Sequence, residues 1–209
     1  TRNISFNICS SKNDYDFIKE NLKETFLKLE DRKIEKVELP FQGKYYKEAI
    51  LSDANVNYLS MGANLKEFGQ SYNAKLSLAT SILSNPYLYE LIRAKGGAYG
   101  AGINIDRSLN LASYSYRDPN ILKTIEAFAK IGDLTKNLKL SERDFTNQKI
   151  SKMGSLIRPK SPDQKADLDY INYKKGKDQS EVEVFLEDIK NASLDDIRAY
   201  ADLFQKAIE

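Results

Sequence analysis

Residues 91–102 read LIRAKGGAYGAG, and the rest of the chain is interpreted outward from this stretch. Its first half completes a helical pattern that ends at Lys95. Gly96 and Gly97 then stop the helix, because glycine takes the left-handed closing conformation without a Cβ penalty. From residue 98 onward the pattern alternates as in a strand. The stretch therefore predicts a sharp corner from a helix to a strand.

The corner leads into a predicted hairpin with strands near 98–105 and 109–117. One face of the first strand has mostly small residues or no side chains. Its residues are Ala98, Gly100, Gly102 and Asn104. Glycine inside a strand weakens it unless a backbone, a helix or a ligand approaches closely. We therefore expect such an approach at this face.

The other segments extend the pattern in both directions. Residues 3–9 alternate as a strand, a helical pattern follows Asn13-Asp14, residues 46–61 read as a long strand, and residues 72–83 read as an apolar helix. The later helices are expected near 119–135, 141–156, 162–175, 180–191 and 194–208. This order predicts an α+β fold with a mixed, mostly antiparallel sheet and helices packed mainly on one face. We expect one domain over residues 1–209.

The charges argue against two classes of partner. Among 209 residues the formal net charge is only +2, so the totals favour neither nucleic acid nor an anionic membrane surface. No apolar stretch approaches the roughly 20 residues that cross a bilayer.

The first residue is Thr1 and the chain opens directly on a strand pattern, so we expect a fragment of a longer protein.

Histidine is absent and cysteine occurs once, which limits the chemistry that the chain can perform alone. Zinc sites nearly always use imidazole ligands, so we expect no metal site in these residues. The single cysteine, Cys9, lies in an apolar alternating run and is predicted to be a buried thiol rather than a nucleophile.

Four segments resemble one protein family, in the order in which that family has them. LIRAKGGAYGAG is similar to the signature of the C-terminal half of presequence-protease-like members of the pitrilysin/insulinase superfamily of zinc metallopeptidases. The other three similar segments are NVNYLSMG (55–62), SYRDPNILKTIEAF (115–128) and RPKSPDQKA (158–166). The resemblance implies a domain like the LuxS/mitochondrial processing peptidase fold, within a larger enzyme that encloses unfolded peptides in a chamber.

In this family the zinc ion is bound by the N-terminal half, so zinc is implied only for the intact enzyme. The C-terminal half contributes an arginine and a tyrosine that reach the peptide, and the matching residues are Arg93 and Tyr99. Their chemistry fits, since a guanidinium offers fixed donors to a carbonyl and a phenol can donate to a developing oxyanion. Gly97 and Gly100 would let a substrate backbone come near. The implied partners are the peptide and the N-terminal half.

Other readings remain open at this point. Arg93 is also suited to a helix C-terminus, Tyr99 to a core, and Arg117 with Asp118 to a surface pair and helix cap, which we favour over substrate contact. At the level of function, the alternatives are an inactive family member that serves as an assembly or peptide-binding scaffold, and a free-standing domain that binds peptides by strand addition. We expect a bacterial-type cytoplasmic location, or an organellar one in a eukaryote.

Overall fold

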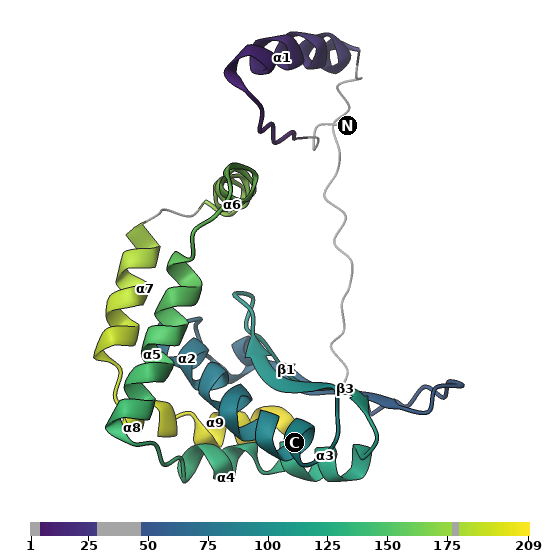
Figure 1. Cartoon of the computed structure of the whole chain (residues 1–209), viewed down its shortest axis with the longest axis vertical. Coiled ribbons are helices and arrows are strands. Elements are labelled where there is room, and N and C mark those ends of the chain that lie inside the picture. The colour runs from purple at the N-terminus through teal and green to yellow at the C-terminus, as the bar shows by residue number, and fades with distance from the viewer. Residues whose placement is uncertain (1–4, 29–46, 177–179) are drawn as a thin grey trace. The chain divides into compact units, whose positions relative to one another are not determined.

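The computed structural model describes residues 5–28, 47–176 and 180–209 (Figure 1). Its elements in chain order are α1 (Lys12–Leu27), β1 (Asn57–Asn64), η1 (Leu65–Phe68), α2 (Ala74–Ile82), η2 (Leu83–Ala94), β2 (Gly100–Ile105), β3 (Asn110–Asp118), α3 (Ile121–Ala129), α4 (Ile131–Lys136), α5 (Glu142–Ile157), α6 (Pro162–Lys175), α7 (Ser180–Asn191), α8 (Leu194–Arg198) and α9 (Ala201–Ile208). None of the helices in this described part is long and apolar enough to cross a membrane.

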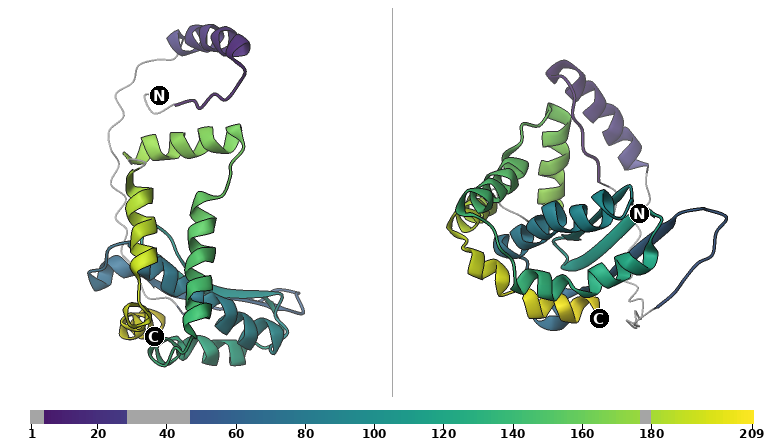
Figure 2. Two further views of the ribbon diagram at one scale, coloured as in Figure 1. Left: turned by 60° about the vertical axis from the view of Figure 1, so that its left-hand side comes forward. Right: turned by 60° about the horizontal axis from the view of Figure 1, so that its bottom comes forward.

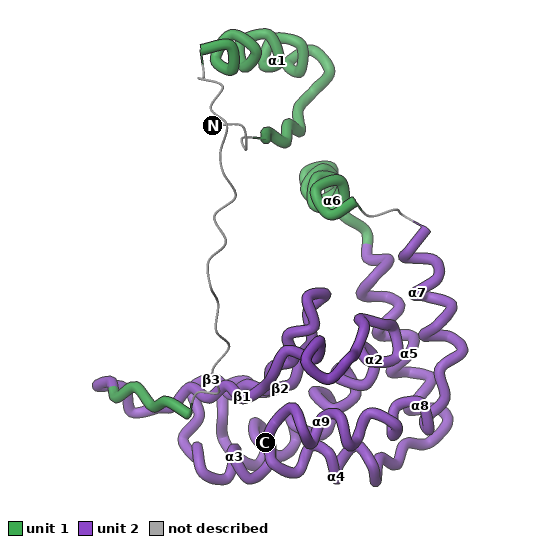
Figure 3. The backbone as a smooth tube through the Cα atoms, turned by 180° about the vertical axis from the view of Figure 1, so that it is seen from behind, with its two compact units in different colours: residues 1–51, 159–178 green, residues 52–158, 179–209 purple. Residues whose placement is uncertain are grey.

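The chain forms two compact units, which Figure 3 colours separately. Unit 1 comprises residues 1–51 and 159–178, and unit 2 comprises residues 52–158 and 179–209. The expectation of a single domain over the whole chain stays a prediction.

Unit 2 is built on an antiparallel sheet in the order β1-β3-β2. The hairpin between β2 and β3 turns at Asp106, whose carboxylate accepts from the backbone amides of Ser108 and Asn110 at 2.7 and 3.1 Å. Helices pack against one face of this sheet, with α3 and α9 against β1 (Figure 1). The α+β class predicted from the sequence is confirmed.

The core of unit 2 lies between the sheet and these helices. Its largest fully buried side chains are Phe128, Phe204, Leu65, Leu76, Leu78, Ile82, Leu83, Leu88, Ile103, Ile131, Leu138 and Ile189. At one end α5 and α7 lie side by side and both contact α2 (Figure 2). The opposite face of the sheet carries half-exposed tyrosines, among them Tyr114 and Tyr116.

Most of the predicted helices are confirmed, with breaks inside two of them. The segment expected at 119–135 divides into α3 and α4 around Lys130, and that at 194–208 divides into α8 and α9. Within η2, Asn85 has the extended angles φ −139° and ψ 116°. A residue before proline is disfavoured in the helical region, so Pro86 accounts for this interruption.

The expected strand at 46–61 is wrong over most of its length, since β1 covers only Asn57–Asn64. The partner strand β3 sets the residue at which β1 begins. Asn57 pairs with Asp118, the last residue of β3, and Pro119 beyond it has no amide hydrogen to continue a ladder. In the described part of the chain, residues 47–56 form no strand.

The predictions for residues 3–9 and for Cys9 are also wrong in the described residues. Residues 5–10 form no strand, and Cys9 is exposed. Within unit 1 this segment is held by side chains instead: Asn7 Nδ2 donates to Asp167 Oδ1 of α6 at 2.9 Å, and the rings of Phe6 and Phe26 meet edge to face at 4.6 Å. An alternating apolar pattern buries a side chain such as that of Cys9 only when the segment forms a strand in a sheet with one covered face.

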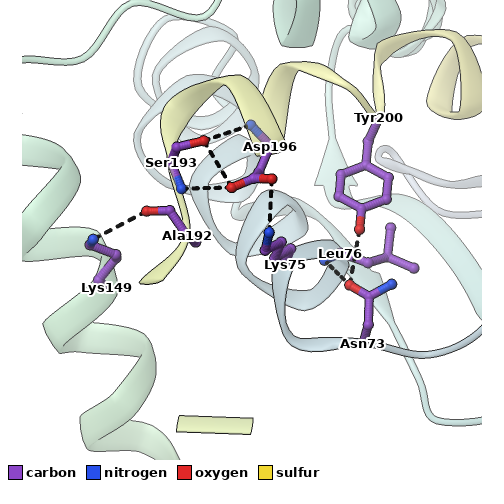
Figure 4. A network of polar contacts seen from close by, with 8 residues as sticks. All are labelled: Asn73, Lys75, Leu76, Lys149, Ala192, Ser193, Asp196 and Tyr200. Atoms are coloured by element: carbon purple, nitrogen blue, oxygen red, sulfur yellow. Dashed lines mark hydrogen bonds and ion pairs between the residues drawn. The ribbon is translucent and has the colours of Figure 1, made fainter. Parts of the chain in front are cut away.

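A polar network joins the start of α2 to α8 (Figure 4). Asp196 accepts a hydrogen bond from Lys75 Nζ at 2.8 Å and from the Ser193 amide at 2.8 Å. These contacts, with that from Lys75 the largest, lower the pKa of Asp196 from 3.8 to about 2. Beside them Asn73 accepts from the Leu76 amide at 2.8 Å and caps α2.

Because the pKa of Asp196 is lower in the folded chain, its contribution to stability is complete above about pH 4 and is lost as the pH falls toward 2. We expect Asp196→Asn to lower the free energy of unfolding at pH 7 and to weaken the fall in stability between pH 4 and pH 2. Urea denaturation across this range measures both effects. The control is Asp195→Asn on the same helix. The Asp195 side chain is 87% exposed. An identical acid profile in wild type and Asp196→Asn would contradict the assignment.

Gly62 on β1 leaves no room for a side chain. A Cβ at this position would lie 1.9 Å from the Leu111 carbonyl oxygen, whereas at Gly154 on α5 it would meet nothing within 4 Å. We expect Gly62→Ala to destabilise the chain by about 3 kcal/mol through overpacking. Gly154→Ala is the matched control and should stabilise by roughly 0.5–1 kcal/mol, since alanine favours a helix interior. Equal effects of the two substitutions on the urea midpoint would refute this close approach.

Candidate functional site

The helix-to-strand corner is closed by backbone hydrogen bonds around Gly97. The Gly97 amide donates to the Arg93 carbonyl at 3.0 Å, and the Ala98 amide donates to the Ile92 carbonyl at 3.1 Å. Gly97 has a φ of +81°, a conformation that side chains rarely adopt. This turn places the last turn of η2 directly beside the start of β2, as the sequence predicted.

Arg93 and Tyr99 lie together on the exposed side of this corner. The Arg93 guanidinium carbon is 5.8 Å from the centre of the Tyr99 ring and 5.1 Å from that of Tyr89. Tyr99 is 65% exposed, so its hydroxyl is accessible and the ring is not part of the core. The two predicted site residues are thus brought to one surface.

The two predicted glycines have different surroundings. Gly97 is exposed in the turn, and its conformation is the reason for glycine there. Gly100 pairs with Tyr116 on β3, and a Cβ at Gly100 would come only within 3.9 Å of that residue, an ordinary contact. Glycine at position 100 is therefore not required by packing within the described residues.

A β-bulge near the end of β3 adds an arginine to this surface. Asn57 pairs with Asp118 and Leu59 with Ser115, so two residues of β3 lie opposite one residue of β1. Leu111, Ser113 and Ser115 point into the core, and unbroken alternation would send Arg117 the same way. Instead Arg117 has a φ of +49° and is exposed.

Arg117 lies against the same tyrosines. Its guanidinium carbon is 5.9 Å from the Tyr99 ring centre and 5.6 Å from that of Tyr116. The Tyr116 ring is 5.2 Å from the Tyr58 ring and 5.8 Å from the Tyr99 ring, both in edge arrangements. A hydrogen bond with Tyr58, followed by the interaction with Tyr116, raises the pKa of Arg117. We call this group of Arg93, Arg117, Tyr58, Tyr99 and Tyr116 the arginine–tyrosine cluster.

Sequence reasoning missed Arg117 and Tyr58 as members of this cluster. It favoured a surface pair between Arg117 and Asp118, but Asp118 is fully buried. The Asp118 carboxylate accepts from the Asn120 amide at 2.7 Å and from the Thr124 hydroxyl. The N-cap position of α3 is Asn120, so the expected N-cap role of Asp118 is wrong. The available signal was the position of Arg117 two residues before Pro119, at the end of an alternating strand.

A second set of contacts fixes the corner to α3. Asn120 Nδ2 donates to the Gly96 carbonyl at 2.7 Å, and Asn57 Nδ2 donates to the Asp118 carbonyl at 2.9 Å. The Tyr99 amide donates to the Tyr116 carbonyl at 3.1 Å. The corner, the bulge and the start of α3 are therefore linked by direct hydrogen bonds.

The cluster carries two positive charges, those of Arg93 and Arg117. Within the described ranges, neither Arg93 nor Arg117 forms an ion pair with a carboxylate. Glu90, one turn before Arg93, instead pairs with Lys95 at 3.4 Å. Two guanidinium groups and three phenols on an exposed surface are suited to donating hydrogen bonds to oxygen atoms of a ligand.

The chain's own residues do not fit a zinc site. The sequence contains no histidine. In the described part of the chain, no group of three or more cysteine, aspartate or glutamate side chains gathers in a way that could hold a metal ion. We derive no metal-dependent step from these residues.

Residues 47–209 match the family described as the PreP C-terminal domain. Protein HypA of Clostridium perfringens is 31% identical over 203 residues, which cover 97% of this chain and 21% of that protein. Presequence protease 1, chloroplastic/mitochondrial, of Arabidopsis thaliana is 30% identical over 155 residues, 74% of this chain and 14% of that protein. The chain thus spans about a fifth of the length of the Clostridium protein and less of the plant one.

Among solved structures, the crystal structure of pitrilysin is similar with a TM-score of 0.48 and 15% sequence identity. The similar region covers 72% of this chain and 16% of the pitrilysin chain.

Proposed function

Because this chain belongs to the family of PreP C-terminal domains, we propose that it is the substrate-binding domain of a zinc metalloendopeptidase that degrades unfolded peptides. The observation that carries the proposal is the pairing of Arg93 with an exposed Tyr99 at the corner after η2. Both side chains present donors to solvent from a backbone held rigidly by the Gly97 turn.

The proposed role of the two residues follows from their chemistry. The Arg93 guanidinium donates to a peptide carbonyl and fixes the orientation of the substrate backbone, because its donors are planar and fixed. The Tyr99 hydroxyl donates to the carbonyl oxygen that becomes negative when the peptide bond is attacked. One such donor lowers the barrier by about 3 kcal/mol, which is roughly a hundredfold in rate.

The partner in this proposal is the half of the enzyme that holds the zinc ion. No metal-binding group gathers among the described residues, and in this proposal the ion and the attacking water belong to that other half. Each half would then hold only part of the substrate, and the chain alone is expected to bind peptides weakly. We propose a cytoplasmic location in a bacterium and an organellar one in a eukaryote, because the relatives include a Clostridium perfringens protein and presequence proteases named as mitochondrial or chloroplastic.

A second way to bind a peptide would be to add it as a strand at the edge of β2, and the contacts at this edge argue against it. The backbone amide of Ile103 donates to Ser84 Oγ at 2.8 Å, and the Ser84 hydroxyl donates to the Ile103 carbonyl at 2.6 Å. The groups that would pair with an added strand at this residue are already used. This contact also fills the bare face at Gly102, where a Cβ would lie 3.0 Å from Ser84 Oγ.

In the intact enzyme we expect Tyr99→Phe to lower kcat/KM by about a hundredfold, because one oxyanion donor is lost. Arg93→Ala should lower it by a similar factor through loss of substrate orientation. Steady-state hydrolysis of an unstructured peptide measures both, and zinc content should stay normal in each variant.

The matched controls are Tyr173→Phe, whose parent side chain is 81% exposed on α6, and Arg143→Ala on α5. Both should retain wild-type turnover. Full activity of the Arg93 and Tyr99 variants would refute their role, and an intact protein without peptidase activity would point to a scaffold.

A further inference from the structure

Arg117 has a strained backbone conformation at the bulge of β3. A residue other than glycine in the left-handed region is strained and keeps this conformation only where its surroundings hold it. Arg117 makes cation–π contacts with Tyr99 and Tyr116 on an exposed surface, where such contacts are weak. Strained residues at bulges occur often at binding sites, where the bulge turns a side chain toward a ligand.

The surroundings of Arg117 favour an anion. Its neighbour Asp118 is the nearest carboxylate in sequence, but that group is buried and bound to Asn120 and Thr124. Arg93 lies on the same Tyr99 ring and adds a second positive charge. The Arg117 guanidinium lies over the Tyr116 ring, and the Tyr58 ring packs against Tyr116 in an edge arrangement.

The geometry points to a second binding site: we propose that Arg117, bordered by Tyr58 and Tyr116, binds a carboxylate of the peptide whose backbone is held by Arg93 and Tyr99. This proposal rests on the proposed peptidase function, since it takes the ligand to be a peptide. A guanidinium binds a carboxylate through two parallel hydrogen bonds, which a neutral amide cannot match. In a peptide the carboxylate is either an acidic side chain or the C-terminal group.

The test uses three versions of one unstructured peptide in the intact enzyme. The first has one internal glutamate and a free C-terminus, the second has glutamine at that position, and the third has an amidated C-terminus. For wild type we expect the first peptide to exceed one of the other two in kcat/KM by about tenfold, as one charge-assisted hydrogen bond provides. A lower kcat/KM for the glutamine peptide identifies the acidic side chain as the carboxylate. A lower kcat/KM for the amidated peptide identifies the C-terminal group.

Arg117→Gln should reduce this ratio to about one, and Arg117→Lys should keep an intermediate ratio, because lysine has the charge without the planar fork. Arg117→Gly is a second variant that lacks the guanidinium. Glycine accepts a φ of +49°, so this variant should fold without strain. Arg143→Gln, on α5, is the matched control and should keep the wild-type ratio.

Equal cleavage of all three peptides by wild type, or an unchanged ratio in Arg117→Gln and Arg117→Gly, would overturn the carboxylate site while leaving the proposed peptidase intact. If no peptide is cleaved, the proposed function fails instead. Fluorescence anisotropy with the same three labelled peptides then tests the site on its own. A carboxylate-dependent affinity that Arg117→Gln removes supports it, and no such dependence overturns it.

Discussion

The arrangement of the site depends on one backbone constraint, the left-handed turn at Gly97 between η2 and β2. This turn lets the Ala98 amide bond back to Ile92 while the next amide, that of Tyr99, already pairs with Tyr116 on β3. A helix end and a strand start are therefore separated by only a few residues. The proposed functional side chains are attached to this corner or to β3, which pairs with it, except Tyr58, which lies on β1.

The second constraint is the junction between β3 and α3. The buried Asp118 carboxylate holds the Asn120 amide, and the Asn120 side chain holds the Gly96 carbonyl. The same junction contains the bulge that turns Arg117 outward. The corner and the bulge thus share a single hydrogen-bonded support, which explains how side chains 24 positions apart, Arg93 and Arg117, approach the same Tyr99 ring.

The sequence predicted the features that local rules determine. Glycine at a helix end, alternation in the hairpin and the position of Arg93 one turn before the corner are each encoded within a few residues. Features that depend on distant partners were not predictable in this way. The start of β1 is set by Pro119, which follows its partner strand, and the outward turn of Arg117 is set by pairing with residues about 60 positions earlier. Cys9 was misjudged for the same reason, because its burial required a neighbouring strand.

The most direct test of this account is a structure of the intact enzyme with a peptide that it binds but does not cleave. The account predicts a backbone carbonyl of the peptide within hydrogen-bonding distance, roughly 2.7–3.2 Å, of both the Arg93 guanidinium and the Tyr99 hydroxyl. A peptide bound elsewhere, with this corner covered by another part of the protein or left in solvent, would contradict it.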